Sequence, residues 1–152
     1  MFCILDQFPE DLYSNQLIKI LKTQSKRNYD ILIATEPRLN QTHIDIDDAT
    51  TILGSENGLF LHIGKNIKQF NRIDMRVFEV KTNICDVIKN LERNQDFYGW
   101  TDVVKKTISS NLSVYYCDMP ELTWIDIDNS YDYSFATKYF KDIIIYEEQY
   151  SE

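Results

Sequence analysis

Short segments rich in β-branched residues alternate along this chain with segments whose apolar residues recur at helical spacing. Residues 29–37, YDILIATEP, are typical of a buried strand, and Pro37 ends it because proline cannot donate into a central ladder. Residues 82–91 carry apolar side chains at the three- and four-residue spacing of an amphipathic helix. Strands that alternate with helices in this way predict an α/β fold, with a mixed sheet flanked by helices.

A β-hairpin is predicted where the dipeptide Asn57-Gly58 separates two β-rich segments. This pair tolerates the positive φ that a tight hairpin turn requires. The remaining strands are expected at residues 1–5, 72–80 and 112–117.

In residues 72–80, RIDMRVFEV, apolar side chains alternate with Asp74, Arg76 and Phe78, as in a strand with one wetter face. Three further helices are expected from the spacing of apolar residues. The first starts at Ser14, and Leu17, Ile20 and Leu21 form its apolar stripe. The second follows Gly99 with Val103, Val104 and Ile108 inward, and the third starts at Asn129 or Ser130 with Tyr133, Ala136, Phe140 and Ile143 on one face.

The 152 residues carry a formal net charge of −8 and are 43% hydrophobic, which suits one globular domain over residues 1–152. No apolar run is long enough to cross a bilayer and no secretory signal is recognisable, so we expect a cytoplasmic protein with no membrane contact. The acidic balance argues against a nucleic-acid partner, which requires clustered lysine and arginine. Cys3, Cys85 and Cys117 are odd in number and far apart, and they predict neither a disulfide framework nor a zinc site.

Three aspartates are crowded before the last expected helix. Asn129 and Asp132 have the spacing of residues that cap a helix start. Asp126 and Asp128 alternate with apolar residues in a short extended segment, and a divalent-metal role for either stays open. The EF-hand loop, which needs glycine at its sixth position and glutamate at its twelfth, is not matched from Asp126 or from Asp45.

Lys65 follows Gly64 at the end of the second hairpin strand, where its ammonium group could meet a phosphate. A solvated lysine is the alternative, because long charged side chains commonly keep their head in water.

Three segments resemble, in order and spacing, the later portion of sugar-nucleotidyltransferase-type enzymes. They are IDIDDATTIL at 44–53, LFLHIGKNIKQFNRIDMRVFEV at 59–80 and LTWIDIDNSYDYSFATKYF at 122–140. The closest similarity is to archaeal inositol-phosphate and related cytidylyltransferases. The resemblance implies a partial Rossmann-like nucleotidyltransferase fold that lacks the N-terminal nucleotide-binding half. It also implies nucleotidyl transfer, cytidylyl transfer above all, onto a phosphorylated sugar or polyol with magnesium as the cofactor.

The resemblance assigns roles to five residues. Asp6, in ILDQF, resembles the first metal-binding acid, and Asp126 resembles the second, with Asp128 as its alternate. Lys65 resembles the lysine that holds the phosphate of the acceptor, which makes it the expected catalytic and substrate-binding residue. Asp74 is the other residue expected to bind the substrate.

The chain departs from the family in two places. Family members begin with a glycine-rich loop that holds the triphosphate, and nothing similar occurs in these 152 residues. Met75 and Arg76 stand where members usually carry a small residue and a glycine beside the acceptor pocket.

The sequence therefore supports two hypotheses. In the first, the protein transfers a nucleotidyl group once a nucleotide-binding partner chain supplies the loop. In the second, it is a non-catalytic interaction module that pairs with itself or a partner through exposed sheet edges.

Overall fold

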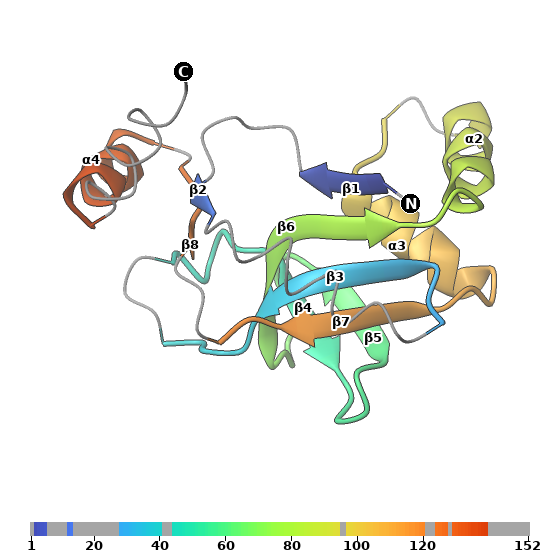
Figure 1. Cartoon of the computed structure of the whole chain (residues 1–152), viewed down its shortest axis with the longest axis horizontal. Coiled ribbons are helices and arrows are strands. Elements are labelled where there is room, and N and C mark those ends of the chain that lie inside the picture. Colours follow the sequence, from blue (N-terminus) through green and yellow to red (C-terminus); the bar gives the residue numbers. More distant parts are fainter. Residues whose placement is uncertain are drawn as a thin grey trace, which may run out of the picture.

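Six strands form one mixed sheet in the described part of this computed structural model, residues 2–5, 12–13, 28–40, 44–94, 97–120, 124–127 and 129–139. Five strands follow the order β5-β4-β6-β3-β7, and β1 pairs with β6 outside this path. Strands β3 and β7 are parallel, whereas the other pairs are antiparallel (Figure 1). The strands are β1 (Phe2–Leu5), β3 (Ile31–Glu36), β4 (Thr51–Gly54), β5 (Phe60–Gly64), β6 (Arg72–Val80) and β7 (Val114–Asp118).

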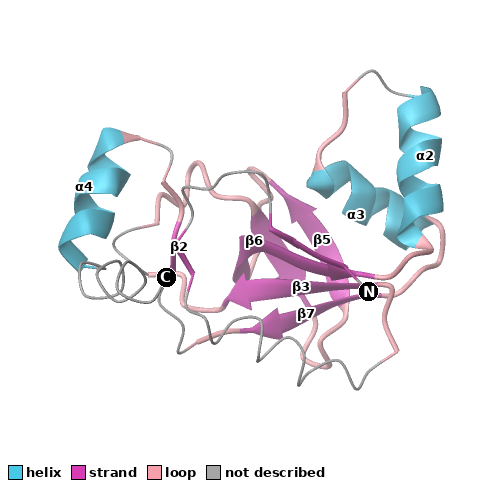
Figure 2. Ribbon diagram, turned by 45° about the horizontal axis from the view of Figure 1, so that its top comes forward, coloured by secondary structure: helices cyan, strands magenta, loops and turns pink. Residues whose placement is uncertain are grey.

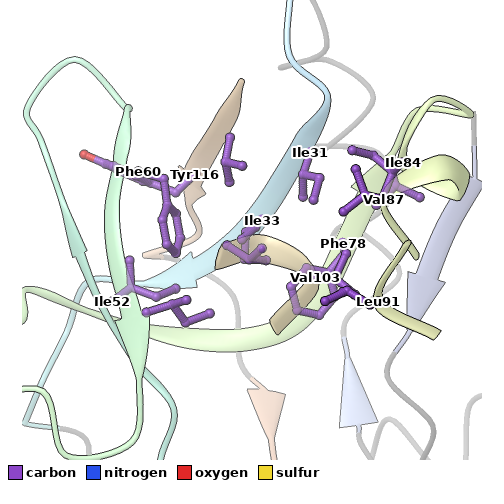
Figure 3. Packing of buried hydrophobic residues seen from close by; sticks show 14 residues of the cluster. Ile31, Ile33, Ile52, Phe60, Phe78, Ile84, Val87, Leu91, Val103 and Tyr116 are labelled. Carbon is purple, nitrogen blue, oxygen red and sulfur yellow. The ribbon is translucent and has the colours of Figure 1, made fainter. Parts of the chain in front are cut away.

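Two helices pack beside the sheet at one end of the molecule (Figure 2). They are α2 (Ile84–Asn94) and α3 (Trp100–Ser109), and both confirm the helices expected from apolar spacing. The main apolar cluster joins them to β3–β7, and the ring of Trp100 stacks on Phe78 with centroids 5.0 Å apart. Figure 3 shows how side chains from the strands and from α2 and α3 converge in this cluster. No helix in the described ranges is long and apolar enough to span a membrane.

A second apolar cluster packs on the sheet and includes residues of β3, β6, β7 and the short strand β8 (Trp124–Ile125). Because β3 contributes to both clusters, all six of its residues are buried. Of the three residues expected on the wetter face of 72–80, Arg76 is partly exposed, but the expectation is wrong for Asp74 and Phe78. Phe78 is completely buried and Asp74 is 7% exposed, since β6 is an internal strand of a sheet covered on both sides.

The β4–β5 hairpin confirms the turn predicted at Asn57-Gly58. Gly58 has φ 87°, a value that glycine adopts without steric cost. The hairpin also reaches the far edge of the sheet, because Tyr116 N donates to Gly58 O at 3.0 Å and Leu59 bridges Tyr115. The two edge strands of the five-strand path, β5 and β7, are thereby partly joined.

A smaller unit stands at the end opposite α2 and α3 (Figures 1 and 2). Here β2 (Leu12–Tyr13) pairs with β8 (Trp124–Ile125), and α4 (Ser130–Tyr139) follows. Asn129 caps α4 as predicted, with Oδ1 accepting from Tyr131 N at 2.8 Å and from Asp132 N at 3.1 Å. Ala136 is buried, whereas Tyr133, which was expected on the same face, is exposed. The helix expected from Ser14 lies outside the described residues, as do Phe140 and Ile143.

Candidate functional site

A pocket of about 280 Å³ lies between the turn at residues 44–50, strand β6, strand β8 and the start of α4. This volume is close to the lower end of small-molecule sites. Polar side chains dominate its wall, with Trp124 and Ile73 among the apolar contributions. The charged residues of the lining are Asp45, Asp48, Asp74, Arg76, Asp126 and Asp132.

A bulge in β6 shapes the inner wall of the pocket. Ile33 and Thr35 are two positions apart in β3, but their partners in β6, Phe78 and Asp74, are four positions apart. The inserted residues include Arg76, whose φ of 58° lies in the left-handed region. Strand β6 bends at this point (Figure 1), pairing with β4 before the bulge and with β1 after it.

Asp74 holds the bulge from within. Its Oδ1 accepts a hydrogen bond from Arg76 N at 2.9 Å, and its own backbone N–H donates to Thr50 O at 2.9 Å. The first bond stabilises the left-handed conformation of Arg76, and the second ties β6 to the end of the 44–50 turn. The carboxylate predicted to bind the substrate therefore lies in the pocket lining and is also part of its backbone support.

Arg76 forms an ion pair inside the pocket. Its Nη2 lies 2.8 Å from Oδ2 of Asp126, with side chains that are 19% and 28% exposed. The two residues are far apart in the chain and come together because β8 passes beside the bulge. A guanidinium and a carboxylate that are both partly withdrawn from water attract each other more strongly than a surface pair.

Lys65 lies next to this arrangement. Its Nζ is 2.6 Å from Oδ1 of Asp48, and the lysine side chain is 51% exposed. The hydrogen bond and charge of Lys65 lower the pKa of the Asp48 carboxyl, and the field of Arg76 contributes further. Asp48 thus connects the lysine, which is outside the lining, with the arginine inside it.

The structure brings together three of the five residues predicted for the site. Asp74 and Asp126 line the pocket, and Lys65 is attached to its lining through Asp48. Asp6 and Asp128 lie outside the described residues, so their placement stays a prediction. Sequence reasoning assigned no role to Asp45 or Asp48, although both belong to the segment IDIDDATTIL that carried part of the resemblance.

The described residues do not fit a resident magnesium ion. Mg²⁺ requires oxygen ligands in near-octahedral geometry, and no group of three or more His, Cys, Asp or Glu side chains in the described ranges is placed to hold a metal. The carboxylates of the lining also have protein donors. Asp126 has Arg76, Asp48 has Lys65, and Oδ1 of Asp45 accepts from Asp47 N at 3.0 Å within its own turn.

Many solved structures share the fold, and two of them illustrate the similarity. One is the inositol-1-phosphate CTP transferase from T. maritima, with a TM-score of 0.68, 24% sequence identity, and coverage of 80% of this chain and 47% of that one. Another is a putative glucose-1-phosphate thymidylyltransferase from Bacillus anthracis, in complex with a sucrose. Its TM-score is 0.62, with 11% identity and coverage of 84% of this chain and 50% of that one.

The sequence matches no protein-family model and no curated protein. This chain spans about half the length of the solved structures that it matches. At these identities the likeness concerns the fold. The chain therefore has a sugar-phosphate nucleotidyltransferase-like fold, which agrees with the architecture implied by the sequence resemblance.

Proposed function

We propose that this protein binds a phosphorylated sugar or polyol as the acceptor side of a nucleotidyl transfer, with cytidylyl as the expected group. The observation that carries the proposal is a pocket lined by aspartate carboxylates beside an exposed lysine, in a nucleotidyltransferase-like fold. The solved structures that share the fold are described as transferases for inositol 1-phosphate and glucose 1-phosphate.

The chemistry of the lining favours a polyhydroxylated ligand. Ionised carboxylates only accept hydrogen bonds, and the lining contains five aspartates. A sugar or polyol brings several O–H donors that can bond to them. A phosphate inside the same lining would be repelled, whereas at the edge it would meet the Nζ of Lys65, which is held near the pocket by Asp48. The hydroxyl groups of the ligand thus belong among the aspartates and its phosphate beside Lys65.

In the proposed transfer, a phosphate oxygen of the acceptor attacks the α-phosphorus of a nucleoside triphosphate and pyrophosphate leaves. Lys65 positions the attacking phosphate and offsets its negative charge. A nucleotide-binding partner chain would contribute the glycine-rich loop for the triphosphate, because no such loop occurs in the 152 residues. The rival hypothesis of an interaction module with exposed sheet edges gains no support from the described strands, since the β4–β5 hairpin partly joins β5 to β7.

Calorimetric titration with matched ligands tests the binding step. We expect inositol 1-phosphate or glucose 1-phosphate to bind more tightly than the unphosphorylated alcohol. A hydrogen bond to a charged group contributes about 1.5–3 kcal/mol, so Lys65→Ala should weaken binding of the phosphorylated ligand roughly tenfold to a hundredfold. It should leave the affinity for the free alcohol nearly unchanged. Lys68→Ala, at an exposed lysine of the same loop, is the matched control.

Equal affinity for the phosphorylated and free alcohols, or equal losses for Lys65→Ala and Lys68→Ala, would contradict the role of Lys65. Absence of binding by all four ligands would overturn the proposed function. The transfer step is tested by release of pyrophosphate from CTP in a complex purified with its native partner, with ATP, GTP and UTP as comparisons.

A further inference from the structure

The backbone position of Arg76 suits glycine better than arginine. Its φ of 58° lies in the left-handed region, which costs a residue with a side chain roughly 1–2 kcal/mol. The chain keeps an arginine here and stabilises the bend with the bond from Arg76 N to Asp74. A strained position that is occupied by a long cationic side chain indicates a role for its charge.

The charge of Arg76 acts on two carboxylates of the pocket. The guanidinium contacts Asp126 at 2.8 Å, and its field also helps to lower the pKa of Asp48, after the larger effect of Lys65. These two aspartates come from different segments, β8 with its continuation and the 44–50 turn. Arg76 therefore compensates negative charge between segments that would otherwise repel each other across the pocket.

We infer that the guanidinium of Arg76 acts as a built-in cation that takes the place of a divalent metal ion against Asp126. A tethered arginine is present at every metal concentration, so the pocket receives its ligand without a metal. This inference rests on the proposed function only in treating the pocket as the ligand site.

The inference predicts that removal of the guanidinium raises the affinity of the pocket for divalent cations. Without it, the five aspartates of the pocket lining have one positive charge fewer among them. Hard divalent cations prefer such oxygen ligands. Glycine at position 76 relieves the left-handed strain and keeps the N–H that bonds to Asp74, so Arg76→Gly should fold. Arg76→Gln keeps a long side chain without its charge and serves as a second variant.

The experiment measures binding of Mn²⁺ by electron paramagnetic resonance and by calorimetry, with no sugar phosphate or nucleotide present. Circular dichroism first establishes that each variant is folded. We expect no specific Mn²⁺ site in the wild type, and at least tenfold tighter binding in Arg76→Gly and Arg76→Gln. The additional change Asp126→Asn should abolish the gain. Arg72→Ala is the matched control, because Arg72 also lies on β6 and pairs with Asp118 at 2.7 Å, outside the pocket lining.

Two outcomes would overturn the inference. One is a wild-type Mn²⁺ site that Asp126→Asn removes, because the arginine would then not exclude the metal. The other is a folded Arg76→Gly or Arg76→Gln that binds no more Mn²⁺ than the Arg72→Ala control. Failure of the proposed function is distinguishable, since a protein that binds no sugar phosphate would still show the metal gain.

Discussion

Replacement of Asp74 tests whether this buried carboxylate holds the bulge that forms the pocket. Asp74→Ala removes the acceptor of Arg76 N at 2.9 Å and leaves this donor without its partner carboxylate. An unsatisfied buried donor costs about 1–3 kcal/mol. The left-handed Arg76, which costs roughly 1–2 kcal/mol by itself, also loses its local support. We therefore expect a decrease of about 2–3 kcal/mol in the free energy of unfolding.

A chain that already carries Arg76→Gly separates the cost of the lost hydrogen bond from the cost of the left-handed backbone. Glycine adopts φ 58° without steric cost, so Asp74→Ala should cost about 1 kcal/mol less in a chain that already carries Arg76→Gly. Asp74→Asn retains an oxygen that can accept from Arg76 N, and it should destabilise less than Asp74→Ala. For a chain of this length, a loss of 2–3 kcal/mol corresponds to a fall in Tm of roughly 5–10 °C.

Urea unfolding followed by circular dichroism measures all four members of this double-mutant cycle. A cost for Asp74→Ala below about 0.5 kcal/mol, within the range of ordinary surface substitutions, would refute the role of the carboxylate. An equal cost in the wild-type and Arg76→Gly backgrounds would refute the coupling to the left-handed backbone.

Two further predictions concern residues outside the pocket. A Cβ on Gly54 would lie 2.3 Å from Cε1 of Tyr116, and the hydroxyl of this tyrosine is held because it donates to Ser55 O. Gly54→Ala should therefore lower the free energy of unfolding by about 1–3 kcal/mol, measured by urea titration. No change would show that the ring moves freely. Burial alone would raise the pKa of Asp30, but the backbone N–H of Ser113 and other polar neighbours lower it below 3.8. Its contribution to stability is therefore complete above the unfolded pKa and lost as the pH falls through the lower folded pKa. The stability difference between wild type and Asp30→Asn should be constant near neutral pH and vanish in acid, and a difference that grows below pH 3.8 would contradict this sign.

Features that depend on neighbouring residues could be predicted from the sequence. The turn at Asn57-Gly58, the helix from Ile84 and the cap at Asn129 each follow from backbone preferences and spacings within a few residues. The ordered motifs also indicated the nucleotidyltransferase-like fold and pointed to Lys65, with Asp74 and Asp126, as residues near one site.

How those residues are used depends on the three-dimensional packing of the chain. Period-two alternation assumes an unbroken ladder, but the bulge in β6 inserts residues, buries Asp74 and turns Arg76 into the left-handed region. The sequence marked Arg76 as a departure from a glycine and gave no reason to pair it with Asp126, which lies on a distant segment. That pairing depends on where β8 passes relative to β6. Local sequence therefore specifies the elements, whereas long-range packing places one positive charge among the aspartates and sets the chemistry of the pocket.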